Sequence, residues 1–532
     1  MHAPVPLKHL FLPLAVACGL AAPAAMAAPH VMSGPEVSAA VSHDFMPSLR
    51  GLMPRPDDSS RARHEVPVRP LPTLDGPGQP VDPVVQSQPS TTVVTTPGLG
   101  FDGVGQGFTG PQGTFNVNAA PPDTNGAVGA TQYVQLVNTD LAVFDKATGN
   151  VVYGPVPINT LWAGFGGSCE TDNDGDPVVV YDKAANRWVI SQFAVTAAPY
   201  FHCVAVSATS DATGGYFRYS FPYGSVFPDY PKMGVWPDAY YQTFNMFTNV
   251  FQGPKLCAYD RAKMLQGLPA TQQCFQLGTS VGSVLPADLD GTIAPPAGSP
   301  NYLVSKSTNS LQLLRFHVDW ANTANTTLTG PISIPVAAYT SACNGGTCVP
   351  QSGTRQQLDS LADRLMFRLA YRNRSGVETL VVTHSVTAGT TRKNAFSGVR
   401  WYEIRNPNGS PTIFQQSTFA PDSSYRWMGS AAMDKQGNIA MGYSVSSSTL
   451  HPAIRYTGRL ATDPPGTMQA ETSIIEGTGS QLANLSRWGD YSAMTVDPVD
   501  DCTFWFTSEY LKANGTFNWS TRIASFKFPG CI

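Results

Sequence analysis

The sequence predicts an all-β protein, folded as a seven-bladed β-propeller of four-stranded antiparallel blades. Two features of composition and one of pattern predict it: few charged residues, many dispersed glycines and prolines, and a recurring hairpin unit. Only 13% of the 532 residues are charged, which excludes coiled coils and helical bundles. The 48 Gly and 45 Pro lie among Val, Thr, Tyr, Phe and Trp, as in proteins built from many short strands and turns.

The hairpin unit consists of an apolar strand, a tight polar turn and a second apolar strand. Its clearest copy covers residues 176–193 and turns at 182–186. Seven copies follow one another along the chain: 124–144, 176–193, 232–244, 288–307, 364–385, 427–444 and 490–508. One or two further apolar runs follow each copy, so each unit is a predicted four-stranded sheet and the series a propeller. Two packed β-domains are the alternative.

The two ends of the predicted propeller are complementary. The last unit ends with the strand at 521–528 and is one strand short, whereas residues 91–96 form an orphan strand before the first hairpin. We expect this N-terminal strand to complete the last blade and close the ring. The propeller domain therefore covers residues 91–532, and residues 28–90, which are Pro-rich, are a predicted linker or pro-segment.

The first 27 residues have the pattern of a signal peptide. Lys8 and His9 precede the apolar run 10–22, and Ala25-Met26-Ala27 is a small-residue cleavage site. We expect cleavage near Ala27 and a secreted protein, extracellular or periplasmic. No later stretch is long and apolar enough to span a bilayer. A net charge of −4 gives no reason to expect nucleic acid as a partner, and we expect a monomer.

Eight cysteines follow the leader, an even number that indicates disulfides in an oxidising compartment. No C-x-x-C motif or Cys–His cluster points to a metal or redox role. The expected pairs join sequence neighbours: Cys169–Cys203, Cys257–Cys274, Cys343–Cys348 and Cys502–Cys531.

Acidic residues recur where the first strand of each unit begins. In a propeller these positions converge at one mouth of the central channel, although they are far apart in sequence. The acids at these positions are Asp123, Asp174, Asp176, Asp229, Asp288, Asp290, Asp363 and Asp490. Their other interpretation is local, because Asp before a strand often bonds to the backbone of its own turn.

Three arginines, Arg364, Arg426 and Arg487, occupy equivalent starts in three successive units. Converging guanidinium groups repel one another unless anions offset them. The neighbouring Asp363 and Asp490 could do so, or a bound carboxylate, sulfate or phosphate could.

The same positions supply candidates for proton transfer and for ligand contacts. Tyr491 stands beside Asp490 and Arg487, which would suit a general acid or base, although a packed aromatic beside a turn is the more common arrangement. The predicted catalytic set is Asp490, Tyr491, Asp229 and Asp176. The predicted ligand-binding set is Arg364, Arg426, Arg487, Lys232 and Trp488. Three closely spaced acids, Asp172, Asp174 and Asp176, could bind Ca²⁺, although the EF-hand spacing is absent.

Two resemblances to known proteins bear on these motifs. An arginine cluster at the mouth of a propeller resembles the sialidase superfamily in architecture, which implies a clamp for a sugar carboxylate. The segments 122–126, 175–178, 229–232 and 487–492 are similar to motifs of an uncharacterised family of exported bacterial propeller-like proteins. That likeness spans nearly all of residues 120–531 and implies no activity.

Two hypotheses of function follow. In the first, the channel mouth recognises an anionic extracellular ligand, an acidic polysaccharide or surface glycan, and acts as a glycoside hydrolase or polysaccharide lyase. In the second, the same surface binds glycans or proteins without catalysis, as an adhesin does, and the acids are structural. The chain has no G-x-S-x-G elbow, Walker loop, H-E-x-x-H or dinucleotide motif, so other enzyme classes lack support.

Overall fold

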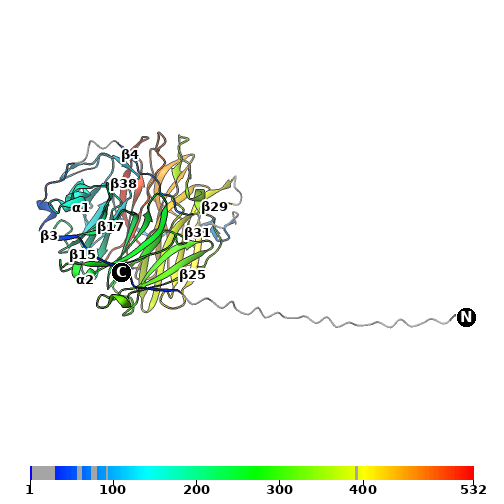
Figure 1. Ribbon diagram of the computed structural model, residues 1–532. Helices are drawn as coiled ribbons and strands as arrows, with labels where there is room; N and C mark the ends of the chain where they lie inside the picture. Colours follow the sequence, from blue (N-terminus) through cyan, green and yellow to red (C-terminus); the bar gives the residue numbers. More distant parts are fainter. Residues whose placement is uncertain (3–29, 57–62, 73–80, 92–93, 390–393) are drawn as a thin grey trace.

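A computed structural model describes residues 1–2, 30–56, 63–72, 81–91, 94–389 and 394–532 (Figure 1). The predicted signal peptide therefore lies almost wholly outside the described residues. The all-β class is confirmed, since nearly all regular structure in the described ranges is strand. No helix within these ranges has the length and apolarity needed to cross a membrane.

Six groups of four consecutive strands form antiparallel meanders in the described chain, and a seventh group consists of three consecutive strands and β6. The first three groups contain β10 (Asn125–Val128), β11 (Gln132–Leu136), β12 (Asp140–Asp145), β13 (Val151–Pro157); β14 (Val178–Asp182), β15 (Arg187–Ala194), β16 (Tyr200–Ser207), β17 (Tyr216–Gly224); β18 (Phe227–Val235), β19 (Tyr240–Phe247), β20 (Phe251–Tyr259), β21 (Thr271–Gln276). The next two contain β22 (Val284–Asp290), β23 (Asn301–Ser307), β24 (Ser310–His317), β25 (Thr327–Pro335); β28 (Met366–Arg374), β29 (Val377–Ala388), β30 (Phe396–Arg405), β31 (Thr412–Phe419).

The last two groups contain β32 (Tyr425–Met433), β33 (Ile439–Ser447), β34 (Leu450–Arg459), β35 (Thr472–Ile475); β36 (Ala493–Val496), β37 (Thr503–Tyr510), β38 (Ser520–Lys527), β6 (Thr96–Asp102). We number these groups as sheets 1 to 7 in chain order. The first two strands of each sheet coincide with one of the seven predicted hairpins. A parallel pairing of β22 with β28 joins sheets 4 and 5 into one ten-stranded sheet.

Short elements connect and border the sheets. The remaining strands are β1 (Val31–Ser33), β2 (Glu36–Ala39), β3 (Ser42–Met46), β4 (His64–Glu65), β5 (Val85–Gln86), β7 (Thr109–Gly110), β8 (Gly113–Thr114), β9 (Ala119–Ala120), β26 (Thr347–Val349) and β27 (Leu358–Asp359). The helices are η1 (Leu49–Gly51), η2 (Ile158–Trp162), α1 (Gly167–Thr171), α2 (Arg261–Met264), η3 (Thr323–Asn325) and η4 (Ala342–Gly345).

The N-terminal segment before residue 90 pairs with the sheets. Strands β1, β2 and β3 lie antiparallel to the outer strands β25, β21 and β17, and β5 lies parallel to β31. Figure 1 shows β3 at the edge of the molecule beside β17. The described part of residues 28–90, predicted as a linker or pro-segment, therefore adds a fifth strand to four of the sheets; its role as a pro-segment stays a prediction.

An N-terminal strand also pairs with the last sheet, but not the predicted one. The partner of β38 is β6, which begins at Thr96, where the predicted strand at 91–96 ends. The side chains of β6 explain the difference, because Phe101 packs against Phe144 at 5.2 Å and Trp505 at 6.5 Å between ring centroids. In contrast, the side chain of Val94 is exposed.

The hydrophobic core lies between neighbouring sheets. One cluster shared by sheets 1 and 2 contains Leu136 and Trp188, and another, shared by sheets 7 and 1, contains Trp519 and Tyr133. The first strands also lie in succession, since β10, β14, β18, β22, β28, β32 and β36 each contact the next, and β36 contacts β10. Residues at the starts of these strands are thereby brought to one end of the molecule.

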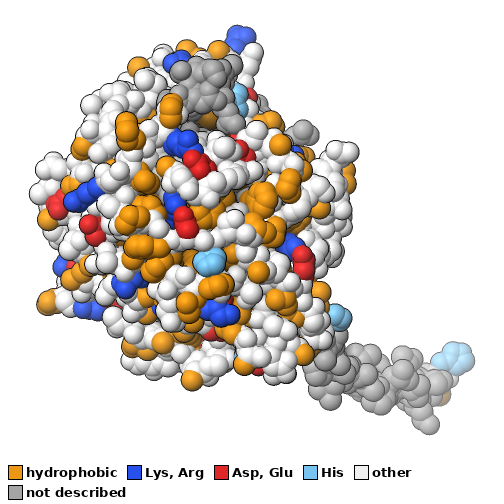
Figure 2. All heavy atoms as spheres, turned by 60° about the vertical axis from the view of Figure 1, so that its left-hand side comes forward, with side chains coloured by type: hydrophobic (Ala, Val, Ile, Leu, Met, Phe, Trp, Pro, Cys, Tyr) orange, Lys and Arg blue, Asp and Glu red, His pale blue; other side chains and the backbone are white. Residues whose placement is uncertain are grey.

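Charged side chains are scattered over the surface in small groups of mixed sign (Figure 2). Many are paired at close range, as in the ion pairs Lys255–Glu36 and Arg455–Glu476. The face in Figure 2 has no broad patch of one sign, in agreement with the small net charge of −4.

The four disulfides join Cys169–Cys203, Cys257–Cys274, Cys343–Cys348 and Cys502–Cys531, which confirms the predicted pairing by sequence neighbour. The last pair ties the C-terminus to the turn before β37, and the third pins a short loop after β25.

These two disulfides should differ in what they contribute to stability. Cys502 and Cys531 are 29 residues apart and Cys343 and Cys348 only 5, so the first removes more conformational entropy from the unfolded chain. We expect the double variant C502A/C531A to lose about 3 to 4 kcal/mol of unfolding free energy, against about 2 kcal/mol for C343A/C348A. Urea denaturation measures both. A larger loss for the shorter loop would contradict this ranking.

Candidate functional site

Four carboxyl groups converge at the starts of β10, β14, β18 and β36. They belong to Asp123, Asp176, Asp229 and Asp490, which we call the carboxyl cluster. Asp123, Asp176 and Asp490 each act on the pKa of another member, Asp176 and Asp490 act on that of Asp229, and three of the four line one pocket. The structure therefore brings together three of the predicted catalytic residues, Asp176, Asp229 and Asp490, from three different sheets.

The backbone at these strand starts adopts a conformation that few side chains tolerate. The φ angles are 49° at Asp123, 45° at Asp176, 55° at Tyr230 and 56° at Asp490. Asp enters this left-handed region more readily than most residues, whereas for Tyr it is strained. The recurrence of Asp thus has the local cause that the sequence also allowed, and the same turns direct the carboxyl groups toward one another.

Asp176 is the most connected member of the cluster. One of its oxygens accepts hydrogen bonds from the Tyr230 backbone N–H at 3.1 Å and from the Tyr491 hydroxyl at 3.0 Å. The Asp123 and Asp176 carboxyl groups lie close enough for each to act on the pKa of the other. Carboxyl groups that interact in this way titrate as a pair.

Burial and mutual repulsion keep protons on the cluster. Burial raises the pKa of Asp123 well above its ordinary value, and the charges of Asp490 and Asp176 add to the shift. Burial also raises the pKa of Asp176. The pKa of Asp229 rises to about 7, because burial and the Asp176 charge outweigh the attraction of Arg364 and Arg69. At neutral pH the cluster can therefore give and accept protons.

Lys232, a predicted ligand-binding residue, lies inside the cluster and is fully buried. Its Nζ stands 3.3 Å from the ring centroid of Tyr230 and 3.2 Å from that of Tyr491, and it donates a hydrogen bond to the Pro231 carbonyl at 2.9 Å. Burial lowers the pKa of Lys232 well below its ordinary value, against the opposing attraction of Asp176. Its position supports the two tyrosines rather than a ligand.

Two of the three predicted arginines reach the cluster. Arg364 donates from Nε and one Nη to Asp363 at 2.7 and 3.1 Å, and its guanidinium lies 4.4 Å from the Tyr230 ring. Arg487 forms an ion pair with Asp490. Each guanidinium is thus offset by a neighbouring carboxylate, one of the two arrangements that the sequence left open.

The pocket between these groups is small. Asp176, Asp229, Arg364, Arg487 and Asp490 form one wall, and residues 66–69 of the N-terminal segment form the other. Its volume is about 20 Å³. That is room for about one water molecule and too little for a sugar ring.

The prediction that Arg426 belongs to this group is wrong. Arg426 is fully buried within sheet 6, where Asp422 and Glu471 hold its guanidinium through paired hydrogen bonds of 2.8 to 3.1 Å. Arg455 and Tyr443 also bond to Glu471. Glu471 precedes β35 and bonds to both Arg426 and Arg455, so Arg426 is part of a charge network inside the sheet.

The prediction that Trp488 contacts ligand is wrong as well. Trp488 is fully buried, packs on Trp427 with 5.9 Å between ring centroids, and donates its indole N–H to Ser444 Oγ at 3.1 Å. Its ring has no open face for a sugar to stack on. Tyr491 is also buried, but its hydroxyl reaches the cluster through Asp176.

The predicted calcium ligands do not form one site. The Asp176 side chain is part of the carboxyl cluster, whereas Asp174 accepts hydrogen bonds from the Val195 backbone and the Thr196 hydroxyl. Asp172 accepts one from Thr171. Within the described ranges, no three acids, histidines or cysteines are arranged to hold a metal ion.

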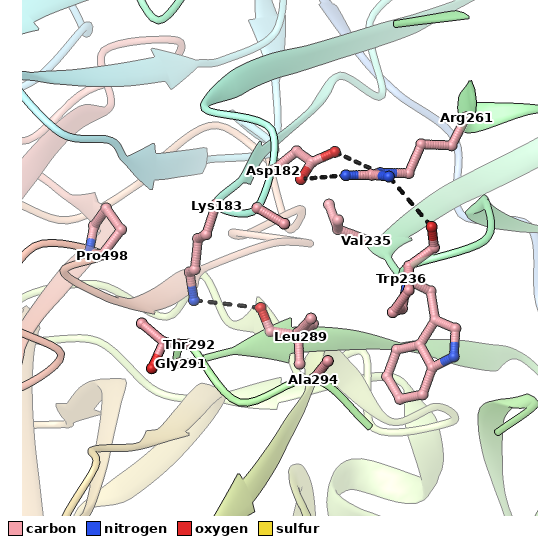
Figure 3. Close-up of a pocket in the computed structure, with 12 residues that line it drawn as sticks. Asp182, Lys183, Val235, Trp236, Arg261, Leu289, Gly291, Thr292, Ala294 and Pro498 are labelled. Atoms are coloured by element: carbon pink, nitrogen blue, oxygen red, sulfur yellow. Dashed lines mark hydrogen bonds and ion pairs between the residues drawn. The ribbon is translucent and has the colours of Figure 1, made fainter. Parts of the chain in front are cut away.

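A larger cavity of about 310 Å³ lies at the other end of the first strands (Figure 3). Lys183 and Arg261 border it, with Trp236 and Leu289 among its apolar walls. The buried carboxylate of Asp182 holds Arg261, and Asp290 pairs with Lys183. Burial opposes ionisation of Asp290, but Arg368 and Lys183 outweigh it and lower its pKa to about 2. The carboxylates of Asp182 and Asp290 at this end are each paired with a cation, whereas four carboxyl groups converge at the opposite end, so we place the candidate site at the carboxyl cluster.

Several residues of the site escaped the sequence analysis. Asp123 was visible as an acid at a strand start, but nothing distinguished it from the other turn acids. Tyr230 lies beside Asp229 and could have been included on that ground. The covering residues 66–69 belong to a Pro-rich stretch whose sequence carries no signal of contact with the site.

No protein-family model and no curated protein matches the sequence. The structure is similar to that of the N-terminal domain of Nup159, with a TM-score of 0.33 and 10% identity over 84% of this chain and 99% of that chain. It is also similar to a GH43 endo-arabinanase from Bacillus licheniformis, with a TM-score of 0.28 and 9% identity over 66% and 97% of the chains. A third similar structure is that of an exo-beta-1,3-galactanase from Phanerochaete chrysosporium, with a TM-score of 0.30 and 12% identity over 81% of this chain and 97% of that chain.

The pKa of Asp229 predicts a pH dependence of stability. A carboxyl group with a pKa of about 7 in the folded protein and ~3.9 in the unfolded chain keeps a proton that the unfolded chain has lost. It therefore makes the free energy of unfolding fall as the pH rises from about 4 to about 7. We expect the free energy of unfolding of D229N, measured by urea denaturation, to fall less steeply than that of the parent over this pH range.

Asp422 provides a control of opposite sign. Burial raises its pKa, but hydrogen bonds and charge from Arg426 outweigh this and lower it to about 2. The carboxylate of Asp422 contributes to stability above pH ~3.9, and this contribution is lost as the pH falls toward about 2. D422N should be less stable than the parent at pH 6 and approach it near pH 2. If the free energy of unfolding changed equally with pH in D229N and the parent between pH ~4 and ~7, the raised pKa of Asp229 would be disproved.

Proposed function

We propose that this protein is an exported seven-bladed β-propeller that hydrolyses an extracellular glycan at the carboxyl cluster. In this proposal the seven sheets are blades, and β6 closes the ring by completing the last one. The succession of first strands from β10 to β36 and back to β10, and the pairing of β6 with β38, support the architecture. Residues 1–27 are the signal peptide, 28–90 a pro-segment and 91–532 the propeller.

The observation that carries the proposed chemistry is the meeting of Asp229 and Asp490 in one pocket. Asp229, with a pKa of about 7, holds a proton in much of the population near neutral pH. Asp490 is bound to Arg487 through one oxygen, while its other oxygen is buried and has no hydrogen-bond partner among the described residues. Glycoside hydrolysis requires two carboxyl groups at the scissile bond, one of which supplies a proton, and Asp229 and Asp490 line the same pocket.

In the proposed reaction, Asp229 gives its proton to the glycosidic oxygen as the bond from that oxygen to the anomeric carbon breaks. The free oxygen of Asp490 takes a proton from the water molecule that attacks the anomeric carbon. One water is consumed, two sugar ends are released, and proton exchange with solvent restores both carboxyl groups. Asp176 and Tyr491 position the cluster through their mutual hydrogen bond.

The arginines favour an acidic glycan as the substrate. Arg364 uses Nε and one Nη for Asp363, which leaves its second Nη outside that ion pair. The Nε of Arg487 forms no hydrogen bond within the described chain and lies 3.8 Å from a carboxylate oxygen of Asp359. Guanidinium groups with unused N–H donors suit a sugar carboxylate. Protons on the cluster reduce its negative charge and so its repulsion of such a ligand.

The test is the turnover of D490N on a panel of acidic and neutral polysaccharides. We expect the parent to release reducing ends and D490N to be slower by about 10²- to 10⁴-fold, the usual contribution of general acid–base catalysis. Asp174 offers a matched control, because its carboxylate accepts hydrogen bonds from residues 195 and 196 and does not line the pocket, and D174N should keep the parent's rate.

Other readings of the same assay decide the alternatives. Absorbance of unsaturated uronate in place of simple reducing ends would replace hydrolysis by a lyase reaction. Binding without cleavage, retained in D490N, would favour the non-catalytic adhesin. Absence of both binding and cleavage would exclude the glycan as ligand.

A further inference from the structure

Residues 64–71 run across the carboxyl cluster as an extended segment, which we call the strap. It begins with β4, which pairs in parallel with β9, and the backbone N–H groups of His64 and Val66 donate to the carbonyls of Asn118 and Ala120 at 3.0 and 2.7 Å. The strap is thus attached to the body of the protein as an added strand. This is a common mode of binding an extended polypeptide.

The Glu65 side chain fastens the strap to the segment before β36. One of its oxygens accepts hydrogen bonds from the backbone N–H groups of Ser486 at 2.7 Å and Arg487 at 2.8 Å. Arg487 in turn donates from Nη to the Val66 carbonyl at 2.6 Å. Arg487, a residue of the proposed substrate site, therefore uses one of its N–H donors to bind the strap.

The second half of the strap is held by a side-chain stack and an apolar contact. The Arg69 guanidinium lies 4.0 Å from the ring centroid of Phe227, and Leu71 is buried against Phe247 and Phe251. The Leu71 backbone N–H points to Asp363, the ion-pair partner of Arg364, at 3.4 Å. Pro67 and Pro70 favour the extended conformation between these anchors.

We propose that the carboxyl cluster and its arginines form a binding site for an extended polypeptide, and that the strap is its occupant in this chain. While bound, the strap leaves a pocket of about 20 Å³ and closes the site to polysaccharide. Displacement or cutting of the strap opens the site. Binding of the polypeptide stands independently of catalysis; the effect on glycans rests on the function proposed above.

The experiment weakens the strap in the full-length chain with E65A/R69A. A second variant, R69A, removes only the stack on Phe227 and keeps the Glu65 hydrogen bonds should the double variant fold poorly. Glu36 supplies the control, because it lies on β2 and pairs with Lys255 at the outer edge of sheet 3. E36A removes an N-terminal glutamate without touching the strap.

Hydrogen exchange is the first readout. We expect amides of residues 64–71 and 486–492 to exchange at least about 10-fold faster in E65A/R69A, with a smaller increase in R69A and parent rates in E36A. Unchanged exchange in both strap variants would overturn the proposal.

Binding in trans is the second readout. A labelled peptide of residues 63–72 should bind E65A/R69A measurably and the parent at least about 10-fold more weakly, because the parent's own strap competes. The same peptide with alanine at both positions should not bind. A native peptide that fails to bind a folded E65A/R69A would overturn the polypeptide site.

Glycan turnover separates this proposal from the proposed function. Faster turnover in E65A/R69A, inhibited by the peptide, supports both. Peptide binding without any turnover overturns the hydrolase and leaves the polypeptide site standing. Equal turnover in the parent and E65A/R69A, with no peptide inhibition, overturns closure by the strap and leaves the hydrolase standing.

Discussion

The balance of buried charge along the first strands is the constraint on which the rest of the structure depends. Arg368, buried between sheets, is held by Asp288 and Asp290 at 2.8 and 2.6 Å, and Arg487 by Asp490. An unpaired charge at such a depth would cost several kcal/mol. Because Asp288 and Asp290 lie on β22 and Arg368 on β28, sheets 4 and 5 must sit in one relative arrangement for these charges to cancel. The carboxyl cluster is the place where acids outnumber cations, and protons make up the difference.

Much of the fold could be predicted because its signals are local. The turn at 182–186 and the alternation around it identify β14 and β15 without any knowledge of their neighbours. The convergence of Asp176, Asp229 and Asp490 followed from the repeat, since equivalent positions of equivalent strands meet at one end. Disulfide pairing also followed sequence neighbours, because both cysteines of a pair belong to one sheet or its adjoining loops.

The errors arose where side-chain direction decides the outcome. Arg426 and Arg487 stand at similar places in their sheets, but Arg426 turns into sheet 6 toward Glu471, while Arg487 faces the cluster. The next residue, Trp488, points the opposite way from Arg487 and packs in the core. A sequence repeat gives the position along a strand, and a shift of one residue exchanges its two faces. The strap was out of reach because its anchors are distant in sequence: Glu65 bonds to Ser486, 421 residues away, and Leu71 to Asp363, 292 residues away.

The outer strands β1, β2 and β3 cover sheet edges that would otherwise present unpaired N–H and C=O groups to solvent. Exposed edges of this kind recruit strands from other molecules, and the usual result is aggregation. A processed form that lost every residue before 90 would open the carboxyl cluster but also uncover four edges at once, because β5 would be lost together with β1, β2 and β3. Maturation that keeps the protein in solution must therefore cut or release the chain after Met46 and leave the first three strands in place.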